Sequence, residues 1–236
     1  MDNNQLKYPA LIIFLMTICI FSCKKHDGIK EGGEGIVRDI DGNVYHTLII
    51  GRHEWMTENL KTTRYNDGSK IENTGNNNQA WIDNRTGAYS WYDNDISNKE
   101  FFGALYNWYA VNTNNLCPRG WRVPSDAEWN AISRYIAGSR ANSSGNDLVS
   151  EDAEIDPGLF RFVPGGTRYT NFTSGSRESS EGYFYYLGKT GRWWASDDVS
   201  PSGAWYRSMY IDSDKFYRGV NKKTTGFSIR CIRDVK

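Results

Sequence analysis

Two adjacent carboxylates, Asp197 and Asp198, are placed where they could bind a cation or exchange protons with a substrate. Solvated loop acids are the simpler interpretation, so we keep both residues as weak metal candidates and expect no cofactor. Serine-type catalysis would need a histidine base. The predicted folded part offers His46 and His53, and no G-x-S-x-G turn accompanies them. The sequence therefore predicts no catalytic residue.

Phosphate chemistry is the next possibility, because the run GYFYYLGKT extends from Gly182 to Thr190. Five bulky residues separate its two glycines where a phosphate-binding loop has four, so the backbone could not wrap a phosphate. The chain also has 28 basic and 28 acidic side chains, and its formal net charge is zero. Such a chain has no net positive charge that would attract the phosphates of a nucleic acid. We therefore expect neither a nucleotide nor a nucleic-acid partner.

Acylation of Cys23 is the reaction that the sequence supports best. An apolar run from Pro9 to Phe21 follows a lysine and is too short to span a bilayer, as in a signal peptide. The run ends at Ile20-Phe21-Ser22-Cys23, which resembles the lipobox cut by the bacterial lipoprotein signal peptidase. We therefore predict a lipoprotein signal peptide over residues 1–22, and an acylated cysteine with a flexible tether over residues 23–35.

Lipid anchoring also sets the expected location of the chain. Several acyl chains on Cys23 would hold the mature protein on a membrane, since each buried methylene contributes about 0.8 kcal/mol. The predicted location is the bacterial cell envelope, as an outer membrane lipoprotein that is periplasmic or surface-exposed. The alternative is an ordinary secretory signal with an incidental Cys23. The third predicted segment, residues 36–236, is the folded domain.

Two cysteines remain in the predicted folded part, Cys117 and Cys231. Two thiols in an exported chain suggest one disulfide, and two buried free thiols are the alternative. A bond between positions 114 apart would lower the conformational entropy of the unfolded chain, which stabilises the fold by about 4 to 5 kcal/mol. It would join the C-terminal strand to the middle of the domain.

An aromatic and charged hairpin between Trp205 and Val220 is the predicted ligand-binding surface. Strand alternation points half of its side chains outward. Exposed tyrosine, tryptophan and arginine favour recognition of a protein or glycan surface through large, rigid contacts. The alternative is that these aromatic residues are mostly core, with charged turn tips. The candidate residues are Trp205, Tyr206, Arg207, Tyr210, Asp212, Phe216, Tyr217 and Arg218.

Two helices are expected among the elements that position these residues. Ser125 and Glu128 form a capping box after Pro124, and the apolar helical spacing that follows ends at Gly138. The segment Glu100–Val111 is apolar over more than half of a helix circumference, which predicts a buried helix.

Strands account for most of the remaining pattern. Two β-rich runs flank Asp41-Gly42-Asn43, whose Asp-Gly pair suits a hairpin turn. Nine tryptophans, 15 tyrosines and 10 phenylalanines with 23 glycines favour aromatic packing between short antiparallel strands. The predicted strands are Ile36–Ile40, Val44–Ile50, Leu159–Val163, Gly182–Leu187, Arg192–Ala195, Trp205–Ile211, Phe216–Val220 and Phe227–Ile232.

Several ordered motifs run through the predicted domain. They are WMTENL from Trp55, LYNWYA from Leu105, CPRGWRVPSDAEW from Cys117, WWAS from Trp193, AWYR from Ala204 and GFSIRCIRD from Gly226. Together they resemble the Fibrobacter succinogenes major paralogous domain, to which we assign residues 36–236. A weaker likeness, carried by RVPSDAEW from Arg122 and by Gly226-Phe227 with Arg230, is to the formylglycine-generating sulfatase-modifying fold. That fold is a variant of the C-type lectin-like architecture.

These resemblances imply an α+β fold of C-type lectin-like architecture, with two main helices, short antiparallel strands and long loops. In lectin-like folds the late hairpin is often the ligand face, which agrees with the surface predicted above. The expected function is a lipid-anchored cell-envelope protein with a non-catalytic domain that recognises a glycan or protein surface. The alternatives are a structural subunit of a surface appendage or envelope complex, and a metal-dependent enzyme related to the sulfatase-modifying fold.

Overall fold

The structure is a computed structural model of the 236-residue chain, and it describes residues 34–138, 162–170, 183–213 and 216–235. The predicted signal peptide, the predicted acylation site Cys23 and the tether up to residue 33 lie outside the described residues. Within the described ranges, no helix combines the length and the apolarity that crossing a bilayer requires.

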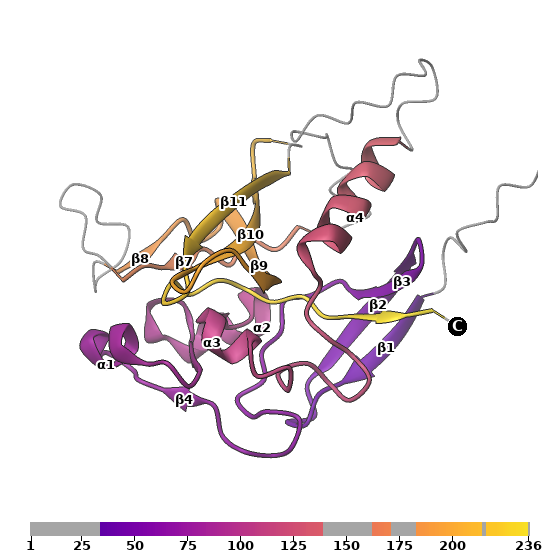
Figure 1. The fold of residues 1–236 in the computed structure, drawn as a ribbon. Helices are drawn as coiled ribbons and strands as arrows, with labels where there is room; N and C mark the ends of the chain where they lie inside the picture. The colour runs from indigo at the N-terminus through magenta and orange to yellow at the C-terminus, as the bar shows by residue number, and fades with distance from the viewer. Residues whose placement is uncertain (1–33, 139–161, 171–182, 214–215, 236) are drawn as a thin grey trace, which may run out of the picture.

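Two antiparallel sheets form the framework of the described chain (Figure 1). The first contains, in spatial order, β1 (Glu34–Arg38), β2 (Val44–Ile50), β3 (His53–Met56) and β12 (Ile232–Asp234), and the second contains β11 (Tyr217–Lys222), β10 (Gly203–Tyr210) and β9 (Thr190–Asp198). The smaller sheets are β4 (Glu72–Asn73) with β5 (Ala88–Ser90) and β6 (Leu105–Tyr106), and β7 (Thr167–Arg168) with β8 (Phe184–Tyr185).

The helices of the described chain are short, with one exception. They are α1 (Asn78–Asp83), α2 (Lys99–Phe102), α3 (Trp108–Val111) and α4 (Asp126–Gly138), with two 3₁₀ turns, η1 (Tyr92–Asn94) and η2 (Ile96–Asn98). The predicted α+β fold of C-type lectin-like architecture with two main helices is therefore wrong. The described chain is mostly β-sheet, and α4 is its one long helix.

The predicted helix Glu100–Val111 is broken at Gly103. Gly103 has a φ of 72° at the end of α2, a conformation that glycine adopts readily. The chain then becomes a strand, because Tyr106 exchanges backbone hydrogen bonds with Phe227 at N···O distances of 2.8 and 3.1 Å. A short apolar stretch does not distinguish a buried helix from a buried strand. The apolar pattern alone therefore predicts the wrong element here.

The hairpin strands agree with their predictions more closely than the C-terminal strand does. β2 has its predicted bounds, β9, β10 and β11 overlap theirs, and β1 begins at Glu34, inside the predicted tether. Of the predicted strand Phe227–Ile232, only Ile232 lies in a strand. The residues before it cross the core, where Ser228 forms an isolated bridge with Trp193.

Two further predicted strands are reduced in the structure. Of the predicted strand Leu159–Val163, residues 159–161 lie outside the described residues and the other two are not in a strand. Of the predicted strand Gly182–Leu187, β8 keeps Phe184–Tyr185, paired with β7, while Gly182 is not described.

β9 separates two parts of the aromatic core. Its neighbouring residues Trp193 and Trp194 are fully buried and point to opposite faces of the sheet by strand alternation. Trp193 packs on the α4 side against Trp129 and Phe216, with ring centroids 6.3 and 6.2 Å away. Trp194 packs on the other side against Phe227, at 4.5 Å. The strand is therefore shared by both parts of the core.

The predicted capping box fixes the start of α4. The Ser125 N–H donates to Glu128 Oε2 at 2.8 Å, and the Glu128 N–H donates to Ser125 Oγ at 3.2 Å. Arg122 donates to both oxygens of the Glu128 carboxylate, at 2.6 and 2.5 Å. The helix continues to Gly138, so this prediction is confirmed.

The predicted disulfide is also confirmed. Cys117 and Cys231 are bonded, with Cα atoms 5.9 Å apart and a sequence separation of 114. Both residues are buried. Next to the disulfide, Arg122 and Ile232 exchange backbone hydrogen bonds at 2.9 and 2.8 Å. The covalent bond and the backbone bridge therefore fasten the segment before α4 to the C-terminal strand.

Acid should weaken the start of α4 through Glu128. Burial opposes ionisation of this carboxyl, but hydrogen bonds from Arg122 and Ser125 outweigh burial and hold its pKa below the ordinary 4.5. A carboxyl whose pKa is depressed on folding stabilises the fold above its unfolded pKa and loses that contribution as the pH falls through the folded pKa. We predict that the free energy of unfolding declines below about pH 4.5 and that Glu128→Gln flattens the decline. Urea unfolding followed by circular dichroism from neutral to acid pH measures it, and an unchanged decline in the variant contradicts the prediction.

Candidate functional site

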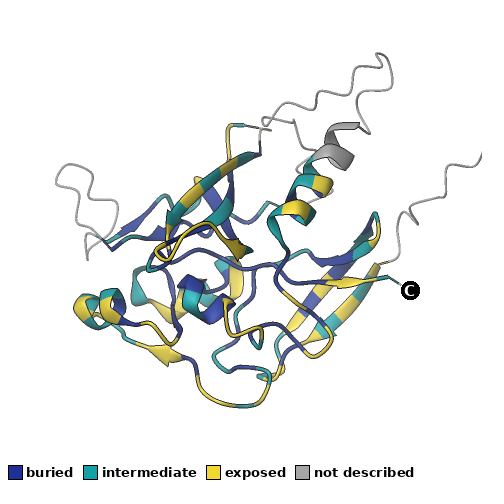
Figure 2. Ribbon diagram, in the orientation of Figure 1, coloured by how far each residue is buried: buried dark blue, intermediate teal, exposed yellow. Residues whose placement is uncertain are grey.

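The sheet of β9, β10 and β11 has one face against α4 and another that is partly open. Alternate residues of a strand point to opposite faces, and directly paired residues of neighbouring strands share a face. Trp205 and Arg207 therefore share the face toward α4. Tyr206 and Tyr210 lie on the other face, and β11 is the exposed edge of the sheet (Figure 2).

Two of the predicted ligand-binding residues lie in the interior. Arg207 is 1% exposed, and its guanidinium donates to Asp126 Oδ1 at 2.7 Å and to Asn130 Oδ1 at 2.6 Å. Phe216 is 2% exposed and packs against Trp129, with ring centroids 5.5 Å apart. These contacts fasten α4 to the sheet, so we leave Arg207 and Phe216 out of the candidate site.

Arg218 covers Trp205 and completes an ion-pair network at the start of α4. Its guanidinium carbon lies 3.3 Å from the centroid of the Trp205 ring, and Nη2 donates to Asp126 Oδ2 at 2.9 Å. Burial opposes ionisation of Asp126, but hydrogen bonds from Arg218 and Arg207 outweigh burial and hold its pKa below 3.8. Asp212 is exposed in the turn after β10. Trp205 and Arg218 therefore contribute to the packing of α4 as well as to the surface.

The remaining hairpin tyrosines lie on the partly open face. Tyr206 is half-buried, and a methyl group added at Gly219 would meet its ring at 2.7 Å. The Tyr206 ring therefore lies across the backbone of β11. Tyr210 is 37% exposed, and its ring stands edge-on to the ring of Tyr217 at 5.6 Å.

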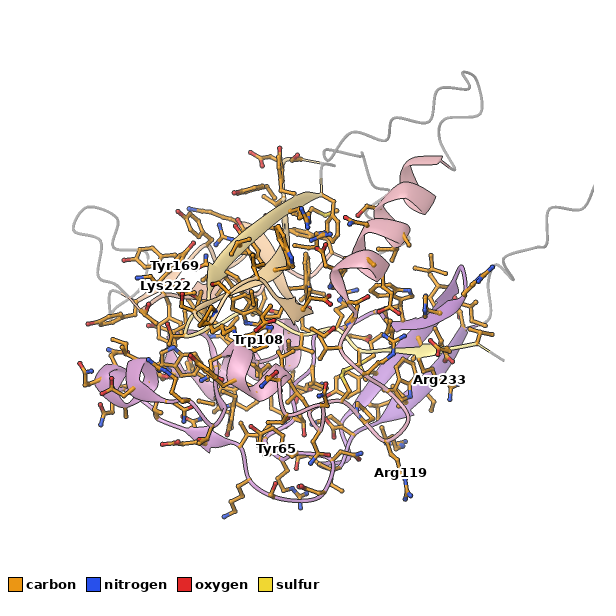
Figure 3. All side chains as sticks on the ribbon, in the orientation of Figure 1. Tyr65, Trp108, Arg119, Tyr169, Lys222 and Arg233 are labelled. Atoms are coloured by element: carbon orange, nitrogen blue, oxygen red, sulfur yellow. A yellow bond between two sulfur atoms is a disulfide. The ribbon has the colours of Figure 1, made fainter. Side chains whose placement is uncertain are left out.

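Two tyrosines from neighbouring segments extend this group. Tyr169 follows β7 and Tyr186 follows β8, and their ring centroids lie 5.9 and 4.8 Å from the guanidinium carbon of Arg192 on β9. Figure 3 shows Tyr169 on the side of the molecule opposite Arg233. We call this group the tyrosine surface, and it consists of Tyr169, Tyr186, Tyr206, Tyr210 and Tyr217.

Tyr186 has a backbone conformation that bulky residues seldom adopt. Its φ of 69° lies in the left-handed region, and the N–H groups of Lys189 and Thr190 both donate to its carbonyl at 3.0 Å. Such strain persists only where the surrounding structure fixes it, and it clusters at functional sites. Sequence reasoning missed Tyr169, Tyr186 and Arg192. The tyrosines after Gly182 were the available signal, because the residues that exclude a phosphate loop also form an aromatic surface.

The tyrosine surface combines neutral phenols with one cation. Burial raises the pKa of Tyr169, and the charge of Arg192 acts against this shift. Burial also raises the pKa of Tyr206, again opposed by Arg192. Both phenols are therefore protonated at neutral pH, and their hydroxyl groups can donate and accept hydrogen bonds.

The weak metal candidates Asp197 and Asp198 do not converge on a site. Asp198 pairs with Lys223, with Nζ 2.8 Å from Oδ2. The Asp197 carboxylate accepts a hydrogen bond from the backbone N–H of Asp126 at the start of α4. Each carboxylate is thus engaged in a separate structural contact.

Within the described ranges, one group of histidine and acidic side chains lies close enough together to hold a metal: His53, Glu128 and Asp234. His53 Nε2 lies 3.2 Å from Glu128 Oε1 and 3.4 Å from Asp234 Oδ1. Arg122 contacts the same two carboxylates at 2.5 and 3.0 Å. Because its guanidinium already supplies the positive charge that a metal ion would bring, we interpret the group as an ion-pair cluster.

The fold and the surface define a disulfide-bonded, β-rich domain with partly exposed tyrosines around a buried arginine. The model of one family, the Fibrobacter succinogenes major domain, matches residues 48–233. The chain belongs to this family, and the resemblance predicted from its motifs is confirmed. No curated protein and no solved structure gives a significant match.

Gly219→Ala should disturb the tyrosine surface through Tyr206. The added methyl group would meet the Tyr206 ring at 2.7 Å and push it from its contacts with Trp194 and Phe227. Overpacking of this kind costs about 1–3 kcal/mol. We predict a loss of this size in the wild-type background and a much smaller loss in a Tyr206→Ala background, where the ring is gone. Urea unfolding of the four proteins measures both, and equal losses in the two backgrounds contradict the prediction.

Proposed function

We propose that the chain is a lipid-anchored cell-envelope protein whose folded domain recognises a glycan or protein ligand at the tyrosine surface and catalyses no reaction. The observation that carries the proposal is the grouping of partly exposed tyrosines from separate segments around Arg192.

The chemistry of tyrosine supports recognition. Its ring is large and rigid and loses little entropy when a ligand orders it, while the hydroxyl group offers a polar contact. Trp193, Trp194 and Phe227 are fully buried, as core aromatic residues should be. Tyr210 and Tyr217 keep accessible surface that the core does not use. The grouping is therefore better explained by an external partner than by the stability of the fold.

The state of the nearby acids favours binding over catalysis. Asp126 is held by Arg207 and Arg218, and Asp198 is held by Lys223. A general acid or base works best with a pKa near the operating pH. The pKa of Asp126 lies below its ordinary value despite burial, and a hydrogen bond from Lys223 lowers the pKa of Asp198. The matched family is also described without reference to any reaction.

The place where the described chain begins suits an anchored receptor. β1 begins at Glu34, 11 residues after Cys23, and a flexible chain of that length reaches on the order of 20 Å. In Figure 1, β1 lies at the right of the molecule, while β7, β8 and the sheet of β9 to β11 lie toward the left. A lipid on Cys23 would therefore hold the molecule from one side and leave the tyrosine surface on another.

Acylation should depend on Cys23. We predict that mass spectrometry of the membrane-bound protein finds Cys23 as the first residue, with added acyl mass, because the preceding residues resemble a lipoprotein signal. Cys23→Ala should abolish both cleavage and acylation. Cys19→Ala is the matched control, since Cys19 lies inside the predicted signal peptide, and it should leave both unchanged. An unmodified mature N-terminus in the wild type contradicts the anchoring proposal.

Tyr210→Ala combined with Tyr217→Ala should weaken ligand capture by more than tenfold while changing stability little. Central aromatic contacts often contribute about 2 kcal/mol or more to binding, whereas surface substitutions usually change stability by about 0.5 kcal/mol or less. Retention of the purified full chain on arrays of glycans and envelope proteins measures capture. The melting temperature of the same samples measures stability.

Val220→Ala is the matched control for this double variant. Val220 is 47% exposed on β11 and pairs with Trp205, so it lies on the opposite face from the tyrosine surface. The control should bind as the wild type does. If the double variant binds equally well, or if Val220→Ala loses as much, the ligand surface lies elsewhere. Turnover of a bound ligand would favour the enzyme alternative, and copurification with an envelope assembly would favour the structural one.

A further inference from the structure

Arg192 lies beneath the tyrosine surface as a buried cation whose hydrogen-bonding capacity is largely unused. The residue is 6% exposed, and Nη1 donates to Thr167 Oγ1 at 2.7 Å. In the described chain, Nε and Nη2 donate to no acceptor. A guanidinium group carries five N–H donors. Most of its donors are therefore free to meet a ligand.

No carboxylate pairs with Arg192 in the part of the chain that the structure describes. Its neighbours are the rings of Tyr186 and Tyr169, at 4.8 and 5.9 Å, and cation–π contacts replace a counter-ion incompletely. Arg207, which is also buried in the same sheet, pairs with Asp126 at 2.7 Å. A buried charge without an opposite charge is unfavourable for the fold. Local arrangements that cost stability, such as this buried charge, are expected at functional sites.

The free edge of the guanidinium group suits an oxyanion. Nε and Nη2 lie on one edge of the planar group, and their N–H bonds run parallel, so together they match two oxygens of a carboxylate or a sulfate. The hydrogen bond from Nη1 to Thr167 holds the plane in place. Thr167 is itself fully buried, which fixes its position. Arg192 is therefore preorganised for a bidentate anion contact.

The tyrosines around Arg192 favour a saccharide over a protein partner. Flat aromatic rings pack against the C–H face of a pyranose ring, and the phenol hydroxyl groups can bond to sugar hydroxyl groups. The accessible part of each ring is limited, with Tyr210 at 37% exposure. A stable protein interface needs on the order of 800 Å² on each partner. A few aromatic rings around one aligned charged group are more typical of a small-ligand site.

We infer that Arg192 is an anion subsite within the tyrosine surface and that the ligand is an acidic saccharide. Its carboxylate or sulfate oxygens bind the Nε–Nη2 edge of Arg192, while a sugar ring packs against Tyr186 and Tyr169. This inference rests on the proposed recognition function and adds the charge and the chemical class of the ligand. Arg192 binds and orients the ligand, and no covalent bond changes.

Matched saccharide pairs test the inference. The probes are oligogalacturonate, oligoalginate and hyaluronan fragments, each beside its carboxyl-reduced neutral counterpart, and a sulfated agarose oligosaccharide beside its desulfated counterpart. Calorimetry with the full chain in detergent should find at least one acidic probe bound more than tenfold tighter than its counterpart. The pair that shows the preference distinguishes a carboxylate from a sulfate. Equal affinity within every pair, or no binding of any probe, overturns the inference.

The tyrosine variants separate failure of this inference from failure of the proposed function. Equal binding of acidic and neutral probes that is lost in Tyr210→Ala with Tyr217→Ala would refute the anion subsite and support the recognition surface. Binding that is unchanged in the double variant Tyr210→Ala with Tyr217→Ala would refute the tyrosine surface as the binding site. Binding of an acidic peptide that depends on Arg192, with no saccharide bound, would overturn the saccharide ligand.

Two substitutions of Arg192 complete the test. Arg192→Met should erase the preference for the acidic probe, and Arg192→Lys, which keeps the charge but loses the paired donors, should retain part of it. Arg192→Met removes a cation that pairs with no carboxylate in the described chain, so its melting temperature should fall less than that of Arg207→Met, which breaks the contact with Asp126. An equal fall in both Met variants, or a preference that survives Arg192→Met, overturns the inference.

Discussion

Two adjacent tryptophans on β9, Trp193 and Trp194, hold together both parts of the core. Trp193 and Trp194 point to opposite sides, and each buried indole must find an acceptor for its N–H. Trp193 Nε1 donates to Asn59 Oδ1 at 2.8 Å, and Trp194 Nε1 donates to the carbonyl of Tyr106 at 2.9 Å. The Asn59 amide in turn donates to the carbonyl of Phe102 at 2.9 Å. Irregular segments are therefore positioned by indole hydrogen bonds more than by long sheets.

The same strand carries the core outward into the tyrosine surface. Arg192 and Trp194 share a face of β9 because they are two residues apart. Tyr206 pairs with Trp194 across the sheet and packs against it, with ring centroids 6.4 Å apart. Aromatic side chains thus continue from the buried Trp194 through the half-buried Tyr206 to the exposed Tyr210. The candidate site is the exposed end of the core, which gives its rings a rigid support.

Sequence reasoning succeeded where local physics decides the structure and failed where distant partners do. The capping box at Ser125 and Glu128 needs a few neighbouring residues, and it was predictable from them. Gly103 and Tyr106 depend instead on a backbone pairing with Phe227, from the far end of the chain. No local pattern contains that partner. An apolar segment that looked helical is consequently divided between a short helix, a strand and another short helix.

The candidate site was only partly predictable because charge pairing is decided in space. Arg192, Arg207 and Arg218 all lie in aromatic strands of the sequence. A chain with 28 basic and 28 acidic residues gives no hint of which arginine will pair with an acid. In the structure, Arg207 and Arg218 share the carboxylate of Asp126, while Arg192 is left to aromatic rings. An apolar side chain at position 192 would be easier to bury than an arginine. The pattern of ion pairs therefore separates the arginines that hold α4 to the sheet from Arg192, which pairs with no acid in the described chain.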